Sequence, residues 1–82
     1  MDFGLALKYL KYGKRVAREG WNGKKMHLQL INSDSYSIKV PIKDGELIPL
    51  LPWIGMKTAD DKFVPWLASQ TDVLAEDWLV IE

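Results

Sequence analysis

The first dozen residues carry apolar side chains at helical spacing. One stripe follows the i, i+3, i+4, i+7 spacing of a buried helix face and consists of Phe3, Ala6, Leu7 and Leu10. The pattern predicts a helix over residues 3–12, with Asp2 as its N-cap and Gly13 as the residue just past its end. A second stripe consists of Leu5, Tyr9 and Tyr12. So wide an apolar arc indicates burial on two sides, by the protein's own sheet and by another subunit.

Alternating apolar and polar residues predict short strands in much of the remaining chain. The clearest alternation runs from Met26 to Ile31 and places His27 on the face opposite Leu28. The dipeptide Asn22-Gly23 predicts a hairpin turn before this strand, because both residues tolerate the positive φ of a type I′ turn. The predicted strands cover residues 15–19, 26–31, 36–40, 53–57, 62–64 and 78–81.

The segments between the strands complete the predicted fold. A loop is expected over residues 41–52, which are interrupted by prolines. A short helix is expected over residues 70–75, because Ser69 and Asp72 have capping-box spacing. The sequence therefore predicts the α+β class: a small antiparallel sheet with an N-terminal helix and a short C-terminal helix, in one domain spanning residues 1–82.

The composition limits what can stabilise so small a domain. The chain has 82 residues, no cysteine and one histidine, which excludes disulfides and thiolate or histidine-rich metal sites. A domain of this size buries only roughly 60% of its unfolded surface, and small domains often gain stability from a partner subunit. We therefore expect a homo-oligomer, with no metal and no cofactor.

The charge is balanced overall but unevenly distributed. Eleven basic residues match eleven acidic ones, yet seven of the basic residues and only two acids lie in residues 1–25. A neutral total disfavours a duplex nucleic acid as the partner, whereas a local basic cluster fits a small anion. No apolar run is long enough to span a bilayer, and the N-terminus does not resemble a signal peptide. We expect a cytoplasmic protein without a membrane partner.

The sequence offers weak support for catalysis. His27 could be a general base or a phosphate partner, but a polar residue on a solvent or interface face is favoured. The acid pairs 60–61 and 76–77 could hold a divalent cation, although turn and helix-end positions explain them equally. No P-loop, zincin or nucleophile-elbow motif is present. No catalytic residue is therefore assigned, and an enzyme is not expected.

Residues 18–25 gather groups that suit a phosphorylated aromatic ligand. Trp21 precedes a glycine-bearing turn, where a partly open indole ring can stack on a base. Arg18 could bind a phosphate in bidentate fashion, and Asn22 and Lys24 could add an amide and a charge. The alternative is a hairpin with solvated lysines and an arginine that pairs with an acid.

Residues 65–72 form a second polar segment beside an indole. Trp66 precedes the short helix, whose first turn offers the side chains of Ser69 and Gln70 as possible contacts for an anion or an amide. Capping by Ser69, with Asp72 in the first turn, is the structural alternative. It leaves Gln70 without a particular role.

Several segments together resemble a family of short phage and prophage proteins that includes the Thoeris anti-defence proteins of the second type. The resemblance covers most of the chain outside residues 32–52. It runs through the N-terminal helix, Gly13-Lys14, Val16-Ala17-Arg18, Gly20-Trp21-Asn22-Gly23-Lys24, Met56-Lys57-Thr58-Ala59-Asp60 and VPWLASQTDVLAEDW at 64–78. The long final segment makes the match specific.

The resemblance implies a sponge that sequesters cyclic nucleotide signals of bacterial immunity in the cytoplasm of the infected host. Thoeris-type members take up a glycocyclic ADP-ribose, and family members form homotetramers with ligand pockets between subunits. Motif position and side-chain chemistry together predict the ligand-binding residues Arg18, Trp21, Asn22, Lys24, Lys57, Thr58, Trp66, Ser69, Gln70 and Asp72. The alternatives are an enzyme that degrades such a signal and a phage protein-interaction module without a small-molecule ligand.

Overall fold

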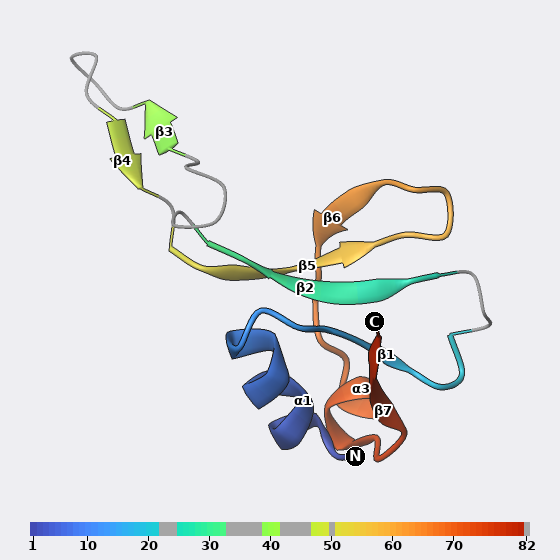
Figure 1. Ribbon diagram of the computed structural model, residues 1–82. Coiled ribbons are helices and arrows are strands. Elements are labelled where there is room, and N and C mark those ends of the chain that lie inside the picture. Colours follow the sequence, from blue (N-terminus) through green and yellow to red (C-terminus); the bar gives the residue numbers. More distant parts are fainter. Residues whose placement is uncertain (22–24, 33–38, 42–46, 50, 82) are drawn as a thin grey trace.

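A computed structural model describes residues 1–21, 25–32, 39–41, 47–49 and 51–81 (Figure 1). The described elements are two helices and seven strands in an α+β arrangement, as predicted. In chain order they are α1 (Phe3–Lys11), β1 (Arg15–Arg18), β2 (His27–Ile31), β3 (Lys39–Pro41), β4 (Leu47–Pro49), β5 (Trp53–Lys57), β6 (Phe63–Pro65), α3 (Gln70–Leu74) and β7 (Trp78–Ile81).

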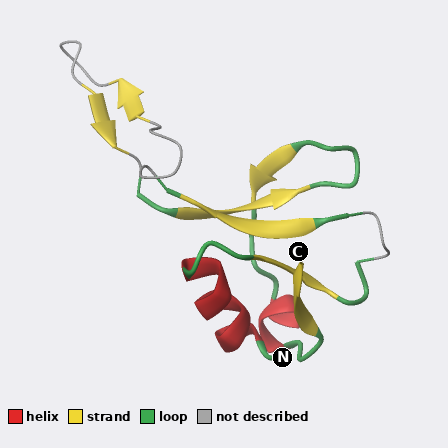
Figure 2. Cartoon of the chain, in the orientation of Figure 1, coloured by secondary structure: helices red, strands yellow, loops and turns green. Residues whose placement is uncertain are grey.

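Five strands form one antiparallel sheet in the order β6-β5-β2-β1-β7. β7 is therefore an edge strand next to β1. Its first residue lies beside the N-terminus (Figure 1), where the Met1 amine donates to the Trp78 carbonyl at 2.8 Å. The remaining strands, β3 and β4, pair with each other and stand away from this sheet (Figure 2). The predicted turn at Asn22-Gly23 lies outside the described residues.

The loop expected over residues 41–52 is wrong in part, because residues 47–49 form strand β4. The prolines that suggested a loop lie at strand ends: Pro41 is the last residue of β3, and Pro49 is the last residue of β4. A proline at a strand end removes less of the hydrogen-bond ladder than one in the middle of a sheet. Part of the predicted strand 36–40 lies outside the described residues.

Helix α1 begins and ends at the predicted signals. The Asp2 side chain accepts a hydrogen bond from the Leu5 N–H at 2.9 Å, and Gly13 has a φ of +86° just past the C-cap. Glycine adopts this left-handed conformation without the steric cost of a Cβ atom. The helix buries Ala6 and Leu10 completely against β1, β2 and β7.

The core lies between α1 and the sheet, and Trp78 is its largest member. It consists of Ala6, Leu10, Val16, Leu28 and Trp78. Burying each large apolar side chain contributes about 1.5–3 kcal/mol. The Trp78 ring also contacts Phe3, Trp21 and Trp66, with ring centroids 5.3, 5.5 and 6.0 Å away. Its indole N–H donates to the Asp72 carbonyl at 2.9 Å, which fixes α3 beside β7.

The opposite face of the sheet carries no helix within the described part of the chain, since both helices lie on the core side (Figure 2). We call it the helix-free face. The strand registers pair Lys57 with both Phe63 and His27, and Ala17 with Leu79. One row across the five strands on this face therefore contains Phe63, Lys57, His27, Ala17 and Leu79.

Candidate functional site

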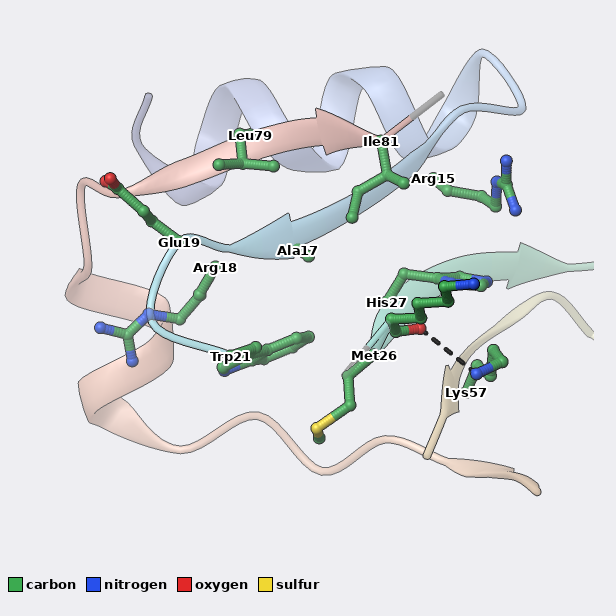
Figure 3. A pocket seen from close by; sticks show the side chains of 11 residues that line it. Arg15, Ala17, Arg18, Glu19, Trp21, Met26, His27, Lys57, Leu79 and Ile81 are labelled. Atoms are coloured by element: carbon green, nitrogen blue, oxygen red, sulfur yellow. Dashed lines mark hydrogen bonds between the residues drawn. The ribbon is translucent and has the colours of Figure 1, made fainter. Parts of the chain in front are cut away.

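A pocket of 580 Å³ lies along β1, from Arg15 at the start of the strand to Glu19 just past its end. It lies over the helix-free face and takes side chains from β1, β2, β5, β7 and the connection between β1 and β2 (Figure 3). Its lining residues are Arg15, Ala17, Arg18, Glu19, Trp21, Lys25, Met26, His27, Lys57, Leu79 and Ile81. The floor is apolar, and the rim is rich in cations.

Trp21 forms an aromatic wall of this pocket. Its ring is half-buried and packs edge-on against Trp78, at a centroid distance of 5.5 Å and an interplanar angle of 76°. The backbone N–H of Trp21 donates to the Arg18 carbonyl at 3.1 Å, which closes a tight turn after β1. Packing on one side and a pocket on the other leave the indole fixed but accessible, as a stacking surface requires.

Arg18 joins the end of β1 to the C-terminal part of the chain. Its Nε donates to Asp77 Oδ1 at 2.9 Å, and its Nη1 donates to Asp72 Oδ1 at 2.8 Å. These hydrogen bonds, led by the one to Asp77, raise the pKa of Arg18 above its ordinary value. The Arg18 guanidinium in turn lowers the pKa of Asp77. Arg18 thus lines the pocket with its charge already balanced by two acids.

Lys57 reaches the pocket from the end of β5. Its Nζ lies 2.7 Å from Asp61 Oδ1 and 3.4 Å from the Lys25 carbonyl oxygen, a contact that is drawn in Figure 3. The hydrogen bond from Lys57 lowers the pKa of Asp61. Thr58 hydrogen-bonds through its hydroxyl to Asp60 and Lys62, within the turn that follows β5.

His27 is buried in the pocket wall, with 8% of its surface exposed. Its pKa is lowered, first by burial and then by the positive charges of Arg15 and Lys57. A hydrogen bond with the Lys25 backbone acts in the opposite direction. The imidazole is therefore neutral at neutral pH. The pattern placed it correctly on the face opposite Leu28, but burial there was not expected.

The structure brings three of the predicted site residues into one pocket: Arg18, Trp21 and Lys57. Asp72 is connected to them through its ion pair with Arg18. Two others lie elsewhere: Trp66 packs on Phe3 and Trp78, and Ser69 caps α3 by accepting from the Asp72 N–H at 3.1 Å.

Two further predicted site residues, Gln70 and Thr58, do not line the pocket. Gln70 is exposed at the first position of α3, and Thr58 lies in the turn after β5. Asn22 and Lys24 lie outside the described residues.

Arg15 and His27 matter most for the chemistry among the lining residues that were not predicted as site residues. Sequence reasoning missed Arg15, and it weighed His27 as a phosphate partner but favoured a solvent or interface face. Both belong to the alternating set that faces away from the helices, as does Lys57. The signal that could have found them is the strand register, because a sheet gathers side chains that are far apart in sequence. Strand order, however, could not be read from the sequence.

The described residues contain no group of three or more His, Cys, Asp or Glu side chains placed to hold a metal ion. Within the same ranges no helix is long and apolar enough to cross a membrane. The chemistry of the pocket thus rests on an indole, a buried imidazole and several cations.

Comparison with known proteins connects the chain to a family. The model of the Thoeris anti-defense 2-like domain, Tad2-like, matches residues 1–81. The protein "Thoeris anti-defense 2" of Bacillus phage SP01 is 49% identical over 84 residues, which cover 99% of this chain and 94% of the phage protein. These matches confirm the resemblance drawn from the N-terminal helix and the final segment. The chain belongs to the Tad2-like family of Thoeris anti-defense 2-like domains.

Proposed function

We propose that the protein is a non-catalytic sponge that binds and sequesters a cyclic nucleotide or glycocyclic ADP-ribose immune signal. Family membership supports a role against bacterial defence, exerted in the infected host. The observation that carries the ligand class is the pocket itself, which combines an accessible indole with cationic side chains. A base and a phosphate are the two parts of a nucleotide that these groups recognise.

The dimensions and charges of the pocket support this proposal. Its 580 Å³ lies within the roughly 300–1,000 Å³ of small-molecule sites. A base stacked on Trp21 gains ~1–3 kcal/mol. Lys57 and Arg15 supply charge for a phosphate, while Arg18 holds the turn that presents Trp21. The proposed binding set also keeps other predicted residues: Asn22, Lys24, Thr58, Ser69, Gln70 and Asp72. Trp66, which packs on Phe3 and Trp78 and does not line this pocket, remains the alternative stacking surface.

We further propose that a second copy of the chain covers the helix-free face and encloses the pocket, within a homotetramer. Phe63 and Leu79 lie on this face and are 44% and 38% exposed. Burial of these exposed apolar side chains by a second copy would be favourable. Light scattering tests the assembly, and a monomer at micromolar concentration would contradict it. Neither duplex nucleic acid nor a membrane is proposed as a partner.

The decisive experiment separates a sponge from an enzyme. Isothermal titration calorimetry with glycocyclic ADP-ribose, and in parallel with cyclic dinucleotides, measures binding. The complex is then denatured, and the released ligand is analysed by chromatography. Intact ligand is the expected result, whereas a linearised product would overturn the proposal in favour of an enzyme with His27 as its candidate base.

A thermal-shift measurement addresses the remaining alternative, a protein-interaction module. Ligand at 100 times its dissociation constant should stabilise the protein by about 2.7 kcal/mol. No shift and no calorimetric signal with any of these nucleotides would contradict the proposed function.

A further inference from the structure

His27 is the only polar or charged side chain that is buried among the residues whose burial the structure describes. It lies in the middle strand of the sheet, directly opposite Lys57 on β5. On its other side, the register of Val16 with Leu28 places Ala17 opposite His27. The small Ala17 side chain leaves the imidazole facing the pocket, which His27 lines.

The charges around the imidazole are mostly positive. β1 contributes Arg15 and, just past its end, Glu19, while β5 contributes Lys57. The connection before β2 contributes Lys25, whose backbone hydrogen-bonds with His27. β7 contributes only the apolar Leu79 and Ile81 (Figure 3).

Ion pairs leave part of this positive charge uncompensated. Lys57 is paired with Asp61 at 2.7 Å. Arg15 and Lys25 make no ion pair with any other residue that the structure describes. A proton on His27 would therefore add to an existing excess of positive charge. An anion in the pocket would reverse this balance, because it attracts every cation on the rim.

We propose that His27, together with Arg15 and Lys57, forms a subsite for a phosphate group of the ligand, and that His27 takes up a proton when this phosphate binds. The proposal deepens the sponge function and rests on it. The free imidazole is neutral because it is buried among cations. The bound phosphate stabilises the imidazolium, so the pKa of His27 is higher in the complex than in the free protein. Between these two pKa values, binding tightens as the pH falls.

The chain offers an unusually clean measurement, since His27 is its one histidine. The ring Cε1–H signal in a 1H–13C NMR spectrum therefore reports its titration without assignment. In the free protein the midpoint should lie below 6.5, the ordinary pKa of histidine. Saturation with glycocyclic ADP-ribose should raise the midpoint by at least about one pH unit, which corresponds to about tenfold tighter binding at acidic than at alkaline pH.

Calorimetry in two buffers of different ionisation enthalpy measures the proton uptake itself. The wild-type protein should take up protons on binding near pH 6, whereas His27→Gln should take up none and should lose the pH dependence of its affinity. Arg15→Gln should raise the His27 midpoint in the free protein, because it removes a repelling charge. The same change should reduce the upward shift that the ligand causes. A role of His27 limited to packing predicts the first of these effects but not the second, because only a bound phosphate produces the upward shift.

A second probe separates failure of this inference from failure of the proposed function. This probe is sulfate, which resembles a phosphate group and does not titrate between pH 5 and 8. Chloride at equal ionic strength is the control. If the nucleotide binds without moving the His27 midpoint, the subsite is wrong and the sponge stands. If sulfate moves the midpoint and calorimetry detects no binding of the nucleotide, the anion subsite stands and the nucleotide ligand is wrong. If neither probe moves it, the subsite is wrong whether or not His27→Gln folds.

Discussion

The Nε atom of Arg18 donates to Oδ1 of Asp77 at 2.9 Å, across 59 residues of chain. This hydrogen bond joins the end of β1 to the residue that precedes β7. Because the Arg18 carbonyl also accepts from the Trp21 N–H, the same residue holds both the sheet edge and the aromatic wall of the pocket. Stability and ligand recognition are therefore coupled at this point of the fold.

The first prediction concerns Asp77→Asn and pH. The pKa of Asp77 is lowered mainly by the Arg18 hydrogen bond, so the carboxylate stabilises the fold above its ordinary pKa of 3.8. That stability is lost as the pH falls through the lowered pKa. We expect the variant to have a lower Tm than the wild type at pH 7, with the difference shrinking below about pH 4. Thermal unfolding followed by circular dichroism measures it.

Glu76→Gln is the matched control for this prediction. It removes an exposed neighbouring carboxylate whose side chain makes no ion pair with another described residue. An equal loss of Tm in both variants, or a difference that persists at pH 2, would show that the Arg18–Asp77 pair does not stabilise the fold.

The second prediction compares Trp21→Ala with Trp66→Ala. Both rings are half-buried and pack on Trp78, but only Trp21 lines the pocket. Both variants should lose similar stability, about 0.5–1.5 kcal/mol from the aromatic contact in addition to the lost burial. Loss of stacking should weaken binding of glycocyclic ADP-ribose to Trp21→Ala about 5- to 150-fold in calorimetry. An equal loss of affinity in Trp66→Ala would place the site at the second indole instead.

The third prediction tests the core with two leucines. Leu28 is completely buried between α1 and the sheet, whereas Leu67 is 91% exposed. Leu28→Ala should lower the free energy of unfolding by about 2–5 kcal/mol, because it leaves a cavity in the core. Leu67→Ala should change the stability of the isolated subunit by about 0.5 kcal/mol or less. Denaturant unfolding measures both, and a large effect of Leu67→Ala would indicate that another subunit buries this residue.

The fourth prediction concerns a close approach on the helix-free face. A Cβ atom at Gly55 would lie only 2.1 Å from Cε1 of Phe63, whose ring covers this glycine. Gly55→Ala should therefore displace the ring from its edge-on contact with Trp53 and cost about 1 kcal/mol. In a Phe63→Ala background the same change should cost nothing, which a double-mutant cycle detects. Equal costs in both backgrounds would contradict the steric explanation.

The elements with local signals were predictable from the sequence. Asp2, Gly13 and Ser69 each act within four residues of their partners, so α1 and α3 could be placed with their caps. The alternation of apolar and polar residues likewise predicted that His27 and Leu28 lie on opposite faces of β2. The sequence does not predict β4, because Pro49 favours a loop, although a strand can end at proline.

The pocket was only partly predictable, for a physical reason. Trp21 and Arg18 were found because they are close in sequence, and Lys57 because of a family motif. The sheet brings together Arg15, His27 and Lys57 because β2 lies between β1 and β5. This arrangement is a property of the strand order. The pairing of Arg18 with Asp77 depends in the same way on β7 returning beside β1.

The ring of Trp78 packs against the rings of both Trp21 and Trp66, so three of the four indoles are close enough to exchange excitation energy. Excitation absorbed by any of them migrates readily to the others at centroid distances of 5.5 and 6.0 Å. A purine stacked on Trp21 would quench the fluorescence of all three indoles. Trp53 would then emit most of the remaining fluorescence. The protein thus contains its own fluorescent reporter of pocket occupancy, and no dye has to be attached.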